Sequence, residues 1–270
     1  MCAGDVLIVH SSLKAIGWVE GGPIAVVNAL KAAVSPGGTV LVPVFTAPQP
    51  DGTFDVQRTP SRTGLITETF RTSEGTRRSL HPTHSVAAWG ERSAELVAGH
   101  DATSGLGVGS PFHKAAQVGA SVLMIGCGLT ACSLVHVAEA IVGVPYLGKV
   151  WYPGYERTLT LIDYEGRRHE VPPRDVPADS AGFTVVSDEL ERRDLIRHCK
   201  VGAAVCIRFS AVDCLSVAAD LLRADPAALL CHKPSCSVCS KARGIVQEAE
   251  KTKRRDAETQ RRNGKEPEWR

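Results

Sequence analysis

His136 and Glu139 are the residues whose types and spacing are best suited to chemistry. They lie three positions apart, and on a helix such a pair projects from one face, about one turn apart. The positive end of a helix disfavours imidazolium in the first turn, so His136 would stay neutral and able to accept a proton. Glu139 would orient the ring. The pair therefore predicts a general base with its orienting partner.

A structural role is the alternative for the same two residues. A single His on a helix is usually satisfied by a neighbour or by water, and perturbed pairs of this kind also occur outside active sites. An HxxE pair with no further His or carboxylate at ligand spacing is a poor metal site. The rest of the chain has to decide between the catalytic and the structural role.

The segments around the pair predict the elements that position it. Residues 120–125 are an apolar run typical of a buried strand, a Gly-Cys-Gly turn follows, and Ser133 is suited to cap a helix. The first half of the chain repeats this alternation. Strands are expected at 5–10, 39–45 and 85–89, and helices at 21–34, 65–71, 93–99 and 112–118. This order predicts an α/β fold with a mixed central sheet flanked by helices.

The character of the sequence changes near residue 154. Two polar-apolar segments flank Glu165-Gly166, which predicts a hairpin. A helix, an extended segment and a second helix are expected at 183–195, 201–209 and 211–222. We therefore expect a smaller β-rich and helical C-terminal portion. Residues 1–240 form a single domain with 154–240 as a subregion, and 241–270 form a charged tail, either a solvated helix or a frayed end.

Composition excludes several classes of protein. The chain of 270 residues is 43% hydrophobic and 22% charged, as expected of a soluble globular protein. No apolar stretch approaches the roughly 20 residues of a membrane span, and the N-terminus does not resemble a signal peptide, so a cytoplasmic location is expected. Residues 241–270 carry a net charge of +4 and the rest −2. A slightly acidic body suits a cationic small ligand better than nucleic acid.

Nine cysteines are spread through the chain without a compact disulfide framework. Cys127, Cys132, Cys206 and Cys214 lie in apolar stretches typical of core positions. A last group has CxxC spacing at its end: Cys231, His232, Cys236 and Cys239. Zinc needs four ligands, and the adjacent Cys231 and His232 can rarely both reach one ion. Reduced cysteines packed near the C-terminus are therefore expected, with a structural zinc site as the alternative that stays open.

Six segments share an order and spacing with a known family: residues 9–22, beginning Val9-His-Ser-Ser-Leu, 59–71, 78–90, 109–111, 136–139 and 144–146. Together, over residues 5–231, they resemble the aminoglycoside N3-acetyltransferase family, acetyl-coenzyme A-dependent enzymes of antibiotic resistance. The family pattern often places an Asn-Thr pair before the catalytic His. Here Cys132 and Ser133 stand in those places, and the lost amide bears on substrate orientation.

The resemblance implies a reaction and its participants. Acetyl-CoA would donate the acetyl group to the 3-amino group of a 2-deoxystreptamine aminoglycoside, with His136 as general base, Glu139 holding its tautomer, and no acyl-enzyme. No metal, nucleic acid or membrane is expected to take part, and the protein would be a monomer or a homodimer. Three alternatives stay open: ping-pong transfer through Cys132, a different amine substrate, and a non-catalytic coenzyme A-binding or regulatory module.

The matching loops also give candidate binding residues. Hydroxyls and free N–H groups at a strand's end suit a pantetheine amide or a phosphate, although Ser11 and Ser12 could instead cap a turn. The expected coenzyme contacts are His10, Ser11, Ser12, Leu13, Arg78, Ser85, Gly109, Ser110 and Lys114. A polycationic aminoglycoside needs carboxylates, for which Asp55, Glu68 and Asp101 are the candidates.

Overall fold

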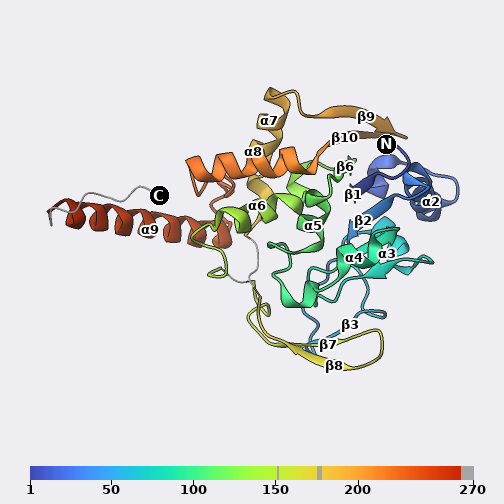
Figure 1. The fold of residues 1–270 in the computed structure, drawn as a ribbon, viewed down its shortest axis with the longest axis horizontal. Helices are drawn as coiled ribbons and strands as arrows, with labels where there is room; N and C mark the ends of the chain where they lie inside the picture. The colour runs from blue at the N-terminus through green and yellow to red at the C-terminus, as the bar shows by residue number, and fades with distance from the viewer. Residues whose placement is uncertain (151, 175–177, 263–270) are drawn as a thin grey trace.

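A seven-stranded mixed sheet forms the centre of the computed structural model, which describes residues 1–150, 152–174 and 178–262 (Figure 1). Its strand order is β4–β5–β2–β1–β6–β10–β9. β1 pairs in parallel with β2 and β6, and every other neighbouring pair is antiparallel. The strands are β1 (Val6–Ser11), β2 (Thr39–Pro43), β4 (Arg77–Arg78), β5 (Val86–Gly90), β6 (Ser121–Ile125), β9 (Arg197–Val201) and β10 (Ala204–Ser210). The predicted fold class is confirmed.

Alternating apolar residues on the strands create a core on each face of the sheet. On β1, Leu7 and Val9 point to one face and Val6 and Ile8 to the other, as the two-residue period of a strand requires. The first face is covered by α2 (Gly22–Val34) and α3 (Leu65–Thr72). The second is covered by α4 (Ser93–Val97), α5 (Pro111–Gln117), α6 (Leu134–Val142), α7 (Thr184–Arg192) and α8 (Ala211–Ala224).

A second, three-stranded sheet lies at one edge of the molecule, with its own small core (Figure 1). The predicted hairpin around Glu165-Gly166 is present: β7 (Leu159–Ile162) pairs antiparallel with β8 (Arg168–Val171). β3 (Thr53–Asp55) joins it from the first half of the chain, parallel to β7. The predicted extended segment 201–209 is present as β10, and it pairs antiparallel with β9, a strand that was not predicted. Gly202, with φ of 57°, reverses the chain between the two strands.

The C-terminal helix α9 (Ser237–Arg262) projects away from the body (Figure 1). Cys239, Ala242 and Val246 are buried at its base, whereas residues 250–260 are exposed. The tail is therefore a helix up to Arg262 and is solvated over residues 250–260, and 263–270 lie outside the described residues. Within the described part of the chain, no helix is both long and apolar enough to cross a membrane.

Candidate active site

A cavity of about 410 Å³ opens where the parallel strands β1, β2 and β6 end. Its walls include His10 and Ser11 at the end of β1, Phe45 after β2, and Cys127 after β6. Other described residues that line it come from distant loops, among them His84, Tyr152, Tyr155 and Asp179. Crevices at the carboxyl ends of strands are the usual ligand sites of open α/β sheets.

His136 lies in the first turn of α6 and lines this cavity. Its Nδ1 lies 2.6 Å from Oε2 of Glu139, and the carboxyl group of Glu139 is buried. A carboxylate accepts hydrogen bonds, so the proton sits on Nδ1 and the Nε2 lone pair is left for the cavity. The contact predicted from the spacing is present, while its catalytic role stays a prediction. Ser133 precedes α6 as expected, but its hydroxyl makes no capping bond.

Tyr146 is the third member of a hydrogen-bonded group with Glu139 and His136, and the sequence alone assigned it no role. Its hydroxyl donates to Oε1 of Glu139 over 2.6 Å. Burial, together with the negative charge of Glu139, raises the pKa of Tyr146 far above its usual value, so the phenol stays protonated. Gly143 ends α6 in the left-handed region with φ of 70° and turns the chain back. A Gly that ends a helix, followed closely by Tyr, was the signal available in the sequence.

The aromatic ring of Phe183 also contacts the imidazole of His136. It is fully buried just before α7, and its ring meets that of His136 edge to face, with 4.6 Å between centroids. This arrangement is a favoured one for aromatic pairs. The ring of His136 is therefore held in orientation by both a carboxylate and an aromatic side chain.

The other histidines of the cavity are uncharged at neutral pH. Burial lowers the pKa of His10 to about 4. Burial is the main cause that lowers the pKa of His84 to about 3. Among the described residues, no Lys or Arg lines the cavity. An amine cation therefore meets no fixed positive charge there.

The residues predicted to bind the coenzyme at the end of β1 fall into two pairs, one with unpartnered polar atoms and one with contacts inside the fold. His10 Nε2 and Ser11 Oγ are buried and have no hydrogen-bond partner among the described residues. Buried polar atoms of this kind normally have a partner, so a ligand would satisfy them. Ser12 instead caps α1 (Leu13–Ile16) by accepting a hydrogen bond from Ala15 N–H, and Leu13 packs against the core under α2. The turn-capping alternative therefore applies to Ser12 and not to Ser11.

Arg78 and Ser85 do not occupy the roles predicted for them. The guanidinium of Arg78 is buried and donates to Ser85 Oγ and to the carbonyl oxygens of Val44, Val56 and Thr59. Ser85 Oγ in turn donates to Val44 O. With these hydrogen bonds made inside the fold, Arg78 is not available to a phosphate, nor Ser85 to a thioester. Both residues instead hold the end of β2 and the loop before β5 in place.

The loop before α5 also differs from the expectation. Gly109 N–H donates to His113 Nδ1, and Lys114 Nζ donates to Ala98 O over 2.6 Å. Ser110 Oγ is buried without a partner in the described chain. None of the predicted residues Gly109, Ser110 and Lys114 is among the described residues that line the cavity. Lys114 contacts the end of a neighbouring helix here, and its phosphate contact stays a prediction.

None of the three predicted substrate carboxylates is among the described residues that line the cavity. Asp55 accepts hydrogen bonds from the N–H groups of residues 57 and 58. Glu68 is paired with Arg71: burial raises the pKa of Glu68, and the hydrogen bonds from Arg71 and Ser61 N–H more than offset this. Asp101 lies in the short helix η1 (His100–Ala102). The acidic residue found in the lining is instead Asp179, which no local motif marks.

A small hollow beside the cavity contains basic groups that sequence reasoning did not single out. It shares His84 and Tyr155 with the cavity and is also lined by Arg157 and Arg174. Arg174 Nη2 donates to Asp101 O, while its Nε is buried without a partner among the described residues. The spare donor suits an anionic group. These arginines lie in stretches without a motif, so only the fold brings them to the cavity.

A His–carboxylate pair that faces a cavity at strand ends has the geometry that proton transfer to or from a bound ligand requires. The family model for aminoglycoside 3-N-acetyltransferases matches residues 8–223, and the chain belongs to this family. The predicted family and enzyme class are confirmed. Aminoglycoside N(3)-acetyltransferase III of Pseudomonas aeruginosa is 31% identical over 234 residues, which span 78% of this chain and 84% of that protein.

Two solved structures are similar over most of the chain. A histidine-to-alanine mutant of the aminoglycoside acetyltransferase AAC(3)-IVa in complex with a gentamicin has a TM-score of 0.79 at 28% identity, covering 90% of this chain and 91% of that one. AAC-IIIb in a binary complex with CoASH has a TM-score of 0.68 at 26% identity, covering 83% and 91%.

Proposed function

We propose that this protein transfers the acetyl group of acetyl-CoA to the 3-amino group of 2-deoxystreptamine aminoglycosides and so confers resistance. One observation carries the proposal: the Tyr146–Glu139–His136 group leaves a basic Nε2 in a cavity whose described lining has no Lys or Arg. The relatives bound to CoASH and to a gentamicin support the choice of ligands.

In the proposed mechanism His136 Nε2 takes the proton of the attacking amine. The nitrogen bonds to the thioester carbonyl carbon, the C–S bond breaks, and the imidazolium returns the proton to the departing thiolate, which leaves as CoA thiol. Glu139 keeps the proton on Nδ1 and stabilises the imidazolium as it forms. Ser11, whose hydroxyl lacks a described partner, replaces Ser85 and Ser12 as the candidate donor to the developing oxyanion.

The walls of the cavity suggest where each substrate binds. The rings of Phe45 and Tyr155 flank His84 at 5.0 and 6.0 Å between centroids, and they offer aromatic faces to ammonium groups. Arg157 and Arg174 in the adjacent hollow would meet the phosphates of the coenzyme. The same fold supports treating 1–240 as one catalytic domain, since β9 and β10 complete the sheet that carries the cavity.

Transfer through a cysteine is the rival mechanism, and we expect Cys132→Ala to retain the wild-type rate. Cys132 is fully buried against Cys214, whose pKa is raised by the contact with Cys132 and by burial. Burial also raises the pKa of Cys127, the other thiol of the cavity, to about 11, and a protonated thiol is a poor nucleophile. Steady-state kinetics of Cys132→Ala and Cys127→Ala, with a search for an acetylated intermediate by mass spectrometry, check this. Loss of turnover together with an acetylated cysteine in the wild type would establish the rival.

Release of CoA thiol with a panel of amines tests the proposed substrate. We expect turnover with 4,5- and 4,6-disubstituted aminoglycosides and none with simple diamines, because small diamines reach few of the cavity walls. Turnover only with other amines would retain the enzyme class and remove the resistance role. Coenzyme binding without turnover on any amine would favour a binding module instead.

A further inference from the structure

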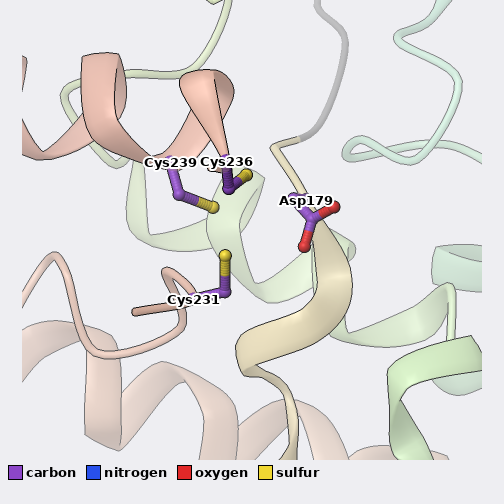
Figure 2. A group of neighbouring side chains, drawn as sticks. All are labelled: Asp179, Cys231, Cys236 and Cys239. Carbon is purple, nitrogen blue, oxygen red and sulfur yellow. The ribbon is translucent and has the colours of Figure 1, made fainter. Parts of the chain in front are cut away.

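Four potential metal ligands gather between the base of α9 and the cavity wall (Figure 2). They are Asp179, Cys231, Cys236 and Cys239, and their donor atoms all lie within 4.8 Å of one another. Asp179 immediately precedes the short helix η3 (Ser180–Gly182), and Cys231 lies in the loop after α8. Cys236 immediately precedes α9, and Cys239 lies in its first turn. Cys231 and Cys239 are buried, and the other two are half-buried.

The spacing of these atoms is close to that of a tetrahedral zinc site. Sulfur lies about 2.3 Å from zinc, so ligands around one ion are about 3.8 Å apart. Donor atoms within 4.8 Å therefore need to move by only about 1 Å to share one ion. We propose that Cys231, Cys236, Cys239 and Asp179 bind a structural zinc ion. Four protein ligands leave no open position, so the site would be structural rather than catalytic.

Neighbouring groups already orient the ligands. Asp179 Oδ1 accepts a hydrogen bond from Ala181 N–H over 2.8 Å, which leaves Oδ2 free for the ion. Arg243 donates to the carbonyl oxygen of Cys231, and Cys236 N–H donates to Lys233 O over 3.0 Å. Such outer contacts fix ligand geometry in metal sites. These contacts therefore fix the conformation of the loop between Cys231 and Cys236 before zinc binds.

The structure resolves the difficulty that spacing alone raised against zinc. His232, adjacent to Cys231, is exposed and lies outside the group. The fourth ligand is Asp179, which comes from a distant part of the sequence, so no local motif announces it. The three cysteines also lie beyond residue 223, where the match to the family model ends.

The proposed ion would join α9 to the wall of the cavity. Asp179 and Ser180 line the cavity, and Phe183, on the same short segment, packs against His136. The opposite side of the ion is held by the first turn of α9. Zinc would thus hold the Phe183 segment in position without touching the reacting atoms.

Metal content tests the proposal directly on the untagged full-length protein purified without chelator. We expect one equivalent of zinc per chain by elemental analysis, and none in Cys239→Ser or Cys236→Ser. Cys2→Ser is the matched control, because Cys2 is exposed at the N-terminus, and it should keep its zinc. Zinc at background level in the wild type, even after zinc is added during expression, would overturn the proposal, as would a disulfide among these cysteines in the native protein.

Cobalt substitution tests the fourth ligand even where a serine variant fails to fold. Co²⁺ in the wild type should give the thiolate charge-transfer and d–d bands of a tetrahedral site with three sulfurs. Asp179→Cys should retain the metal and shift these bands toward a four-sulfur site. Identical spectra in both proteins would exclude Asp179 as a ligand. These readouts do not depend on turnover, so they succeed or fail separately from the proposed acetyl transfer.

Discussion

His136→Ala is expected to lower kcat by about 10²–10⁴-fold, the usual contribution of a positioned general base. The reason is that no other described group of the cavity is both basic and oriented: the pKa values of His10 and His84 are lowered to about 4 and about 3. Binding of acetyl-CoA should persist, because the base acts on the amine. Thiol release measures the rate, and calorimetry with CoA measures the binding.

His136→Gln is the matched control for this loss. Its amide can still donate to Glu139, so the buried carboxylate keeps two hydrogen-bond donors and the fold is preserved, while no base is left. Equal losses of turnover in the Ala and Gln variants, with a normal melting temperature in the Gln variant, would assign the loss to chemistry. Near-normal turnover in either variant would remove His136 from the mechanism.

Glu139→Gln is expected to lower kcat by at least about 10²-fold, although it only replaces one carboxylate oxygen with an NH2 group. A Gln amide N–H directed at His136 Nδ1 would favour the opposite tautomer, with the proton on Nε2 and no lone pair for the substrate. The imidazolium would also lose its negative partner. Single-turnover kinetics at saturating acetyl-CoA check the chemical step, and an unchanged Kd for CoA shows that the cavity is intact.

Tyr146→Phe distinguishes the two roles of the carboxylate. This variant keeps the 2.6 Å contact between Glu139 and His136 and removes only the second donor to a buried charge. Loss of such a hydrogen bond costs about 1–3 kcal/mol of stability. We therefore expect a lower melting temperature and a smaller fall in kcat than in Glu139→Gln. If Glu139→Gln matched the wild type in kcat, the carboxylate would be structural only.

Local patterns predicted the parts of the fold that depend on local periodicity. The strand at 120–125, the turn after it and the helix bearing His136 are present, as are the alternating strands and helices of the first half. The hairpin of β7 and β8 was also predicted from its turn residues. The pairing of distant or unpredicted strands could not be predicted: β3 pairs with β7, and the predicted 201–209 strand, β10, pairs with β9.

The candidate site shows the same contrast between features set by local sequence and features set by tertiary packing. The His136–Glu139 contact depends on spacing within one helix, and the first family motif includes His10 and Ser11 of β1, which line the cavity. Arg78 was expected to contact the coenzyme because it lies in a polar loop of the family motif, whereas the fold surrounds its guanidinium with carbonyl oxygens. Asp179 and Phe183 reach the cavity only through tertiary packing, and no spacing in the sequence predicts that.

The central position of β1 has a consequence for how the chain is made. β1 pairs with β6 across roughly 110 residues of sequence, as the pairing of Leu7 with Ser121 shows, and α6 packs on α8 near the far end of the domain. Contacts of this range close slowly. During translation the apolar side of α6 therefore stays uncovered until residues 211–224 have left the ribosome, and an exposed face of this kind invites aggregation. The packing of α8 on α6 therefore makes folding of the nascent chain depend on slow, late contacts.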